Sequence, residues 1–312
     1  MNDLHRLLQA SVTERDHPWC LATLVNTEGS SYRQPGARLL VYPEGRGTIG
    51  FLSGGCLEKE LARQGTEVIA SDVARLVHID TRKLFGCDGR LSIYLEKIPA
   101  AGEEGNFLTR MAERVIASRT TCRVVVPYAD GEPSGFLPGK ALVLEREGTF
   151  VQSVPLPPRL VVFGNGPEIA PLAAFAEGLG WMFHRHSHPD ELPADFTADA
   201  ATAAVVMTHK FGRDLAALDR LLPLGLPYLG LLGPKRRQQE LLSRFADFHD
   251  AGLPPEWLAA LHAPAGLDTG SESPEEIAFS ILAEAATVLA GRTGGFLKDK
   301  AGAIHQLKEA RA

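Results

Sequence analysis

The segment Ser53-Gly54-Gly55-Cys56-Leu57-Glu58 places a thiol in a glycine turn. An apolar segment precedes this turn and a helical pattern follows it, which puts Leu61 on the apolar face and Glu58 toward solvent. The unpaired N–H groups at a helix start lower the pKa of a cysteine thiol, and they also suit phosphate. A thiolate attacks electrophiles and binds soft metals. The spacing alone leaves a second interpretation open, in which Cys56 is a small buried side chain that only packs.

Two further segments carry groups that suit the same chemistry. Residues 26–37 form a polar loop, and the Gly29 backbone, the Ser30 and Ser31 hydroxyls and the Arg33 guanidinium are able to bind an anion. The alternative is an ordinary solvated loop. Cys87 lies in a second glycine turn next to a strand pattern. Two cysteine turns in one small α/β unit favour a shared site.

The second half of the chain contains a strand, a glycine turn and a helix in succession. The apolar run 159–163 leads into Gly164-Asn165-Gly166, and a helix and a second strand follow. This pattern is typical of a Rossmann-like βαβ unit. The third glycine of the dinucleotide fingerprint is missing, and no acidic residue follows the second strand. Arg185 stands there instead, where it would suit the 2′-phosphate of NADP. His209 follows the next strand, at the edge where such sheets bind ligands.

These motifs need two folded domains to position them, and a length of 312 residues agrees with that number. The expected fold class is α/β. We expect an N-terminal α/β domain over 1–100 that carries the two cysteine turns, and an α/β extension with a proline linker over 101–156. A C-terminal, Rossmann-like parallel-sheet domain is expected over 157–292, followed by a polar tail over 293–312.

Composition narrows the function classes. Apolar residues make up 45% and charged residues 22% of the chain, as in a globular protein. A net charge of −6 argues against a nucleic-acid partner. No apolar run is long enough for a membrane span, and the first residues lack a secretion pattern. The four cysteines form no C-x-x-C pair. We therefore expect a cytoplasmic protein with free thiols.

A set of motifs spread over most of the chain resembles the XdhC/CoxI family, the accessory (maturation) proteins of xanthine and carbon monoxide dehydrogenases. The matching segments are 29–37, 53–58, 86–89, 161–166, 208–209, 228–237, 266–268 and 273–284.

The resemblance implies a chaperone for the molybdenum cofactor rather than a catalyst. Such a protein binds the cofactor transiently and shields it while a cysteine desulfurase supplies the sulfido ligand. It then delivers the cofactor to an apo-xanthine dehydrogenase-type molybdoenzyme, and it is usually an oligomer, here expected as a homodimer.

On this interpretation Cys56 contacts the molybdenum. The wider set of predicted cofactor-binding residues is Ser53, Gly54, Gly55, Cys56, Gly29, Ser30, Ser31, Arg33, Cys87, Gly164, Gly166 and His209.

Two other functions stay open at this stage. One is an NAD(P)-dependent oxidoreductase that uses the Rossmann-like domain, for which the ordinary NAD signal is weak. The other is a non-catalytic scaffold that only recruits the desulfurase or the dehydrogenase.

Overall fold

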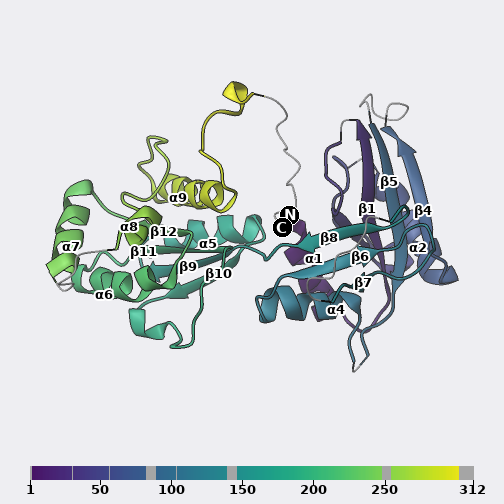
Figure 1. Ribbon diagram of the computed structural model, residues 1–312, viewed down its shortest axis with the longest axis horizontal. Helices are drawn as coiled ribbons and strands as arrows, with labels where there is room; N and C mark the ends of the chain where they lie inside the picture. Colours follow the sequence, from purple (N-terminus) through teal and green to yellow (C-terminus); the bar gives the residue numbers. More distant parts are fainter. Residues whose placement is uncertain are drawn as a thin grey trace. The chain divides into compact units, whose positions relative to one another are not determined.

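The structure is a computed structural model that describes residues 2–29, 31–55, 57–81, 89–102, 104–138, 146–247 and 254–301 (Figure 1). Three of the predicted site residues, Ser30, Cys56 and Cys87, lie outside the described residues. The chain divides into two compact units, Met1–Pro157 and Pro158–Ala312.

A five-stranded antiparallel sheet is the centre of the first unit. Its order is β3-β2-β1-β5-β4. The strands are β1 (Trp19–Gly29), β2 (Arg38–Val41), β3 (Thr48–Gly50), β4 (Arg75–Asp80) and β5 (Gly89–Ile98). Side chains alternate along β1, so Trp19 and Leu21 enter one apolar cluster, while Cys20 and Leu24 enter the cluster on the opposite face.

Helices cover both faces of this sheet. Helix α2 (Glu58–Ser71) packs on the Cys20 face through Leu61 and Val68. The Trp19 face is covered by α1 (Asn2–Thr13), by α4 (Phe107–Ala112) with its π-helical continuation (Glu113–Ala117), and by a small second sheet. That sheet has the order β7-β6-β8, with β6 (Cys122–Val126), β7 (Gly135–Phe136) and β8 (Phe150–Val154).

Two cysteines belong to these cores. Cys20 and Cys122 are both buried and carry free thiols. Burial and the neighbouring Glu96 raise the pKa of Cys20 to about 12, and burial also raises the pKa of Cys122. A thiol protonated this strongly is a poor nucleophile and a poor metal ligand, so these two cysteines are structural.

The second unit is built on a parallel sheet of order β10-β9-β11-β12-β13. The strands are β9 (Arg159–Gly164), β10 (Met182–His186), β11 (Thr202–Met207), β12 (Tyr228–Leu231) and β13 (Leu261–His262). Strands β9 and β11 are buried on both faces, which explains their unbroken apolar runs. The strand order reverses between β9 and β11, and such a point is where open α/β sheets bind ligands.

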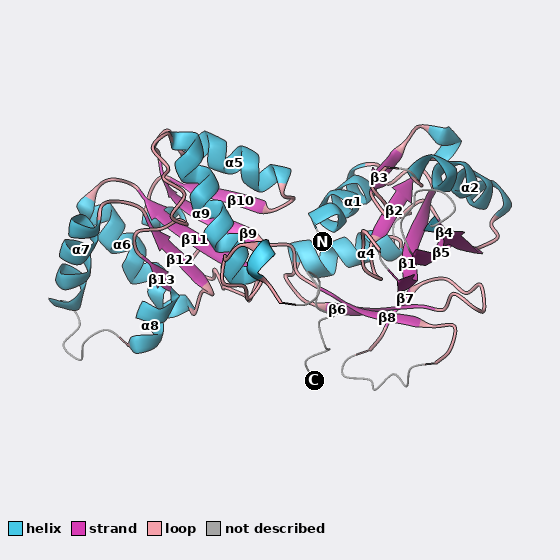
Figure 2. Cartoon of the chain, turned by 90° about the horizontal axis from the view of Figure 1, so that it is seen from above, coloured by secondary structure: helices cyan, strands magenta, loops and turns pink. Residues whose placement is uncertain are grey.

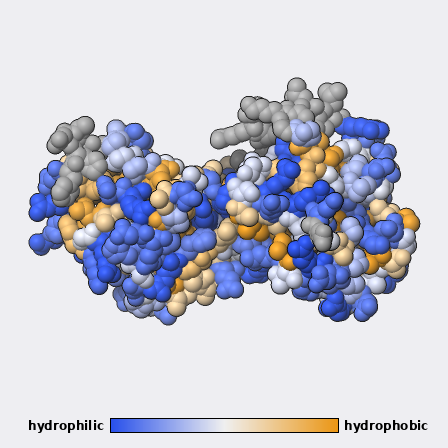
Figure 3. Space-filling view, turned by 90° about the horizontal axis from the view of Figure 1, so that it is seen from below, coloured by the Kyte–Doolittle hydropathy of each residue, from blue (hydrophilic) through white to orange (hydrophobic). Residues whose placement is uncertain are grey.

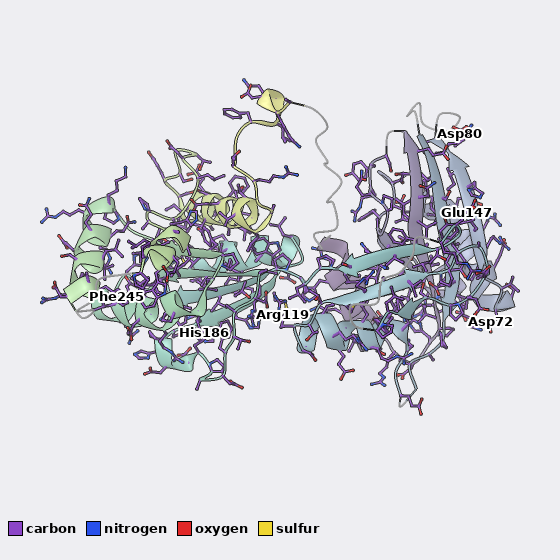
Figure 4. The ribbon with its side chains drawn as sticks, viewed as in Figure 1. Asp72, Asp80, Arg119, Glu147, His186 and Phe245 are labelled. Carbon is purple, nitrogen blue, oxygen red and sulfur yellow. The ribbon has the colours of Figure 1, made fainter. Side chains whose placement is uncertain are left out.

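Helices lie on both faces of this parallel sheet, as Figure 2 shows. Helices α5 (Ile169–Gly178) and α9 (Pro274–Leu289) cover one face through Leu172 and Ile281. Helices α6 (Phe211–Leu221) and α7 (Lys235–Asp247) cover the other through Leu218 and Phe245, the latter labelled in Figure 4. A short helix, α8 (Pro255–Ala260), precedes β13. The predicted α/β class and the Rossmann-like C-terminal sheet are thus confirmed.

Hydrophilic residues cover most of the face shown in Figure 3, with apolar residues in small separate patches. Among the described residues, none of the helices combines the length and the apolarity that a bilayer crossing requires.

Candidate functional site

The turn before α2 is organised around the carboxylate of Glu58. Oε1 accepts hydrogen bonds from the N–H groups of Leu52 (3.1 Å) and Ser53 (2.9 Å). Oε2 accepts from the Ser53 hydroxyl (2.8 Å) and the Leu57 N–H (3.1 Å). Glu58 is only 8% exposed. A single buried carboxylate therefore holds the residues on both sides of the predicted cysteine turn.

The Ser53 hydroxyl also fixes the two neighbours of residue 56. Its oxygen accepts hydrogen bonds from the N–H groups of Gly55 (3.2 Å) and Leu57 (3.1 Å). Gly55 has a φ of 106°, a conformation that L side chains rarely adopt. The backbone that enters and leaves position 56 is thus held by one hydroxyl, and that hydroxyl is in turn held by Glu58.

The placement of Glu58 toward solvent, expected from the helical pattern, is wrong. Burial opposes its ionisation, but hydrogen bonds from the Ser53 N–H and hydroxyl, and from the Glu58 and Leu52 N–H groups, outweigh burial and lower the pKa of Glu58. An ionised carboxylate of the chain therefore already accepts some of the N–H groups that this helix start would offer to a bound anion. The sequence signal that could have indicated the buried carboxylate is an acidic residue at the first position of a helix, five residues after a serine.

The three sequence motifs follow strand ends that point the same way in the first sheet, but at two levels, because Gly29 lies seven residues further along β1 than Ala22, the partner of Leu39. The loop 31–37 joins the end of β1 to the start of β2, and Leu39 of β2 pairs with Gly50 at the end of β3, just before the Ser53 turn. Gly29 at the end of β1 pairs with Gly89 at the start of β5, and Asp80 at the end of β4 pairs with Arg90. Figure 4 labels Asp80 at the end of β4.

The Gly29–Arg33 loop is built from short-range contacts. Gly29 has a φ of 74° where the chain leaves β1. The Ser31 hydroxyl donates to the Arg33 carbonyl oxygen (2.6 Å), and the Arg33 side chain is half-buried. The next residue that the sheet fixes is Gly36, whose N–H bonds the Leu24 carbonyl oxygen (2.7 Å). Gly29, Ser31 and Arg33 therefore lie on one short loop at the sheet edge.

A buried arginine that the sequence motifs do not mark ties this loop to the small sheet. Nη1 of Arg38 donates to the Gly36 carbonyl oxygen (3.1 Å) and to Gln152 Oε1 of β8 (2.7 Å). Burial lowers the pKa of Arg38 to about 10, and the carboxylate of Glu96 acts in the opposite sense. Arg38 remains charged at neutral pH and anchors the end of the loop.

The second predicted ligand-binding site is the edge of the parallel sheet in the second unit. Gly164 ends β9 and pairs with Met207 of β11. A methyl group on Gly164 would lie 2.7 Å from the Met207 carbonyl oxygen, so only glycine fits there. Arg185 of β10 donates from Nε to the Gly164 carbonyl oxygen (3.1 Å) and from Nη2 to Asn165 Oδ1. The Ser187 hydroxyl also donates to Asn165 Oδ1 (3.1 Å).

Glu168 lies over the second glycine of the turn. A methyl group on Gly166 would be 2.3 Å from Glu168 Oε2 and 3.3 Å from His209 Nε2. Glu168 Oε2 and His209 Nε2 are 4.0 Å apart. Glu168 is 7% exposed, and within the described part of the chain its Oε2 has no hydrogen-bond partner. The structure therefore brings Gly166 and His209 together, with a carboxylate between them.

The loop that carries His209 is held by a buried ion pair. Asp214 Oδ1 accepts from the Thr208 N–H (3.1 Å) and hydroxyl (2.6 Å). Asp214 Oδ2 is 2.6 Å from Arg237 Nη2 of α7. His209 itself has a φ of 56°, which is uncommon outside glycine. In the portion of the chain that the structure describes, no three His, Cys, Asp or Glu side chains are grouped to hold a metal ion.

Comparison with known proteins agrees with this division into two parts. Residues 12–80 match the XdhC and CoxI family, and residues 160–285 match the XdhC Rossmann domain. The chain belongs to the XdhC/CoxI family. The first match covers the Ser53–Glu58 turn and the Gly29–Arg33 loop, and the second covers Gly164, Gly166 and His209.

Proteins with similar chains come from several bacteria. A probable xanthine dehydrogenase component of Bacillus subtilis is 26% identical over 333 residues, covering 91% of this chain and 97% of that protein. The molybdenum cofactor insertion chaperone PaoD of Escherichia coli is 27% identical over 283 residues, covering 86% of this chain and 82% of PaoD. A crystal structure of a xanthine dehydrogenase from Bacillus halodurans has a TM-score of 0.76 at 26% identity. The match covers 94% of this chain and 97% of that one.

Proposed function

We propose that the protein is a molybdenum cofactor-binding maturation chaperone. In this role it binds the cofactor as cargo, protects it during sulfuration and delivers it to a xanthine dehydrogenase-type molybdoenzyme. Family membership and the similarity to PaoD support a maturation role. The observation that carries the proposal is the network of Ser53 and Glu58, which fixes Gly55 and Leu57 on either side of residue 56.

Cys56 is the proposed molybdenum contact. Molybdenum is soft enough to accept a thiolate ligand, and a carrier that must release its cargo needs few such ligands. Cys20 and Cys122 do not compete for this role because both thiols are buried and carry raised pKa values. We propose that Cys87, the cysteine of the second glycine turn in the sequence, lines the same site.

The phosphate of the cargo is assigned to the Gly29–Arg33 loop rather than to the cysteine turn. Glu58 already accepts the N–H groups of Leu52, Ser53 and Leu57, so these donors are not available to a phosphate. The loop supplies the Ser30 hydroxyl, backbone N–H groups and the Arg33 guanidinium, which suits bidentate contact with phosphate. Gly54 and Gly55 keep the approach to residue 56 free of side chains.

The proposed partners follow from the reaction. Sulfuration requires a sulfur donor, for which we propose a cysteine desulfurase, and delivery requires an apo-molybdoenzyme. We propose that the chain works as a homodimer in the cytoplasm. In this account the protein itself catalyses no covalent step.

Reconstitution of a client enzyme tests the proposed function. An apo-xanthine dehydrogenase-type enzyme is incubated anaerobically with limiting molybdenum cofactor, desulfurase and cysteine, and its activity is followed over time. The wild-type chain is expected to accelerate activation. The acceleration given by the Cys56→Ser variant is expected to be smaller by a factor of about ten or more. Cys122→Ala is the matched control, since it removes a buried cysteine from the core.

Two results would count against the chaperone role. One is activation at the same rate with and without the wild-type chain. The other is a Cys56→Ser variant that stimulates as well as wild type, which would favour a scaffold that only recruits the two enzymes.

A further inference from the structure

The second unit has the strand–turn–helix arrangement that other proteins use to bind dinucleotides. In those folds the pyrophosphate lies over the G-x-G turn at the N-terminus of the following helix. Here β9, the Gly164–Gly166 turn, α5 and β10 occupy the corresponding places, with β9 and β10 parallel. The fold therefore implies a dinucleotide, and the residues of the turn show whether one fits.

The place for the pyrophosphate is taken by a carboxylate of the chain itself. Glu168 is the residue before α5, and its Oε2 lies where a methyl group on Gly166 would be only 2.3 Å away. The side chain is more than nine-tenths buried, and among the described residues no hydrogen-bond donor reaches this oxygen. The space that the glycine opens is thus filled by a negative group, which repels phosphate.

The place for the ribose is also occupied. Arg185 is the residue of β10 that would meet a 2′-phosphate, but its guanidinium is turned onto the glycine turn. It bonds the Gly164 carbonyl oxygen and Asn165 Oδ1, and its Nη2 is 3.3 Å from the Ser187 hydroxyl. The guanidinium that would recognise a 2′-phosphate therefore makes its hydrogen bonds within the protein.

We infer that Glu168 determines the ligand specificity of the second unit by excluding phosphate-bearing dinucleotides from its G-x-G turn. The residues present do not fit NAD or NADP, although the fold around them does. The inference concerns only the second unit and does not depend on cofactor handling by the first. It also predicts that removal of the Glu168 side chain opens the turn, because this side chain fills the space beside Gly166.

Calorimetric titration of the full chain with NADH and NADPH tests this inference. The wild type is expected to show no saturable binding up to about 1 mM, and Glu168→Ala is expected to bind at least one of the two about tenfold more tightly than wild type. Glu168→Gln keeps the volume but removes the charge, and it is expected to gain affinity in the same direction. Glu177→Ala is the matched control, since it removes a charge from an exposed position on the same helix.

Each outcome decides the question. Saturable binding by wild type that Glu168→Ala weakens or leaves unchanged would overturn the inference. So would a Glu168→Ala variant with native circular dichroism that gains no affinity. If Glu168→Ala does not fold, Glu168→Gln decides, and a folded Gln variant without a gain overturns the inference. A gain by Glu177→Ala equal to that of Glu168→Ala would show a general charge effect and contradict it as well.

Discussion

The hydroxyl of Ser53 donates a 2.8 Å hydrogen bond to the carboxylate of Glu58 and accepts the N–H groups of Gly55 and Leu57. These contacts connect the segment after β3, the glycine turn and the first residue of α2 in one hydrogen-bond network. The turn is therefore shaped before any ligand arrives. A preformed turn reduces the entropy that is lost when cargo binds.

Removal of this carboxylate is expected to destabilise the first unit. Glu58→Ala leaves the N–H groups of Leu52, Ser53 and Leu57 without their acceptor, and the free energy of unfolding should fall by about 1–3 kcal/mol. Urea unfolding followed by circular dichroism measures the change. Glu60→Ala, on the exposed side of the same helical turn, is the control and should change stability by about 0.5 kcal/mol or less. Equal effects of the two variants would argue against a structural role for Glu58.

The four cysteines are expected to separate into two classes in the native protein. With a pKa of about 12, Cys20 is thiolate in roughly one molecule in ten thousand at pH 8, and Cys122 is also buried with a raised pKa. Ellman's reagent should therefore react rapidly with at most two thiols in the native protein and with all four in denaturant. Cys56→Ser should reduce the native count by one. Rapid labelling of Cys20, identified by mass spectrometry, would contradict this assignment.

The close approach of β9 and β11 makes Gly164 intolerant of a side chain. A methyl group there would lie 2.7 Å from both Cγ and the carbonyl oxygen of Met207, so Gly164→Ala should lower the free energy of unfolding by about 1–3 kcal/mol. Gly178→Ala at the end of α5 is the control. Its methyl group would meet nothing within 4 Å, and alanine favours the helix by up to about 1 kcal/mol. The melting temperature should therefore fall for Gly164→Ala and rise for Gly178→Ala. A Gly164→Ala variant as stable as wild type would show that the two strands do not approach so closely.

The start of α9 provides a pH-dependent contribution to stability. Hydrogen bonds from the backbone N–H groups of Ser273 and Glu272, together with the Ser273 side chain, lower the pKa of Glu276 below its ordinary value of 4.5. A carboxyl group whose pKa is lowered by folding stabilises the fold above pH 4.5, and this contribution disappears as the pH falls through the folded-state pKa. The melting temperature of Glu276→Gln should therefore lie below that of wild type at pH 7, and the two should converge as the pH falls well below 4.5. Glu275→Gln in the same turn is the control, and a difference that grows toward low pH would contradict the sign.

The sequence predicts the backbone of this protein better than it predicts where its charged side chains point. The apolar run of β9 and the glycine turn that follows it are local signals, and each appears in the structure where the pattern places it. Glu58 is different. Helical periodicity put it in solvent, whereas the preceding turn folds back over it and supplies its hydrogen bonds. That contact depends on the path of the turn in three dimensions, which periodicity does not describe.

Glu168 and Arg185 illustrate the same limit in the second unit. In the sequence, the missing third glycine and the missing acidic residue weaken the NAD signal. The sequence left Arg185 open as a contact for a 2′-phosphate, whereas in the structure its guanidinium bonds the Gly164 carbonyl oxygen and Asn165. Sequence spacing identified the edge of the sheet but not the side chains that fill it.

The central claim is that Cys56 binds the molybdenum of a transiently held cofactor, and anaerobic titration with free molybdenum cofactor, read by its absorbance, tests it most directly. Wild type is expected to saturate near one cofactor per chain, and Cys56→Ser to bind about tenfold more weakly or worse, with Cys122→Ala like wild type. Wild type that binds no cofactor, or Cys56→Ser that binds with unchanged affinity, would contradict the account.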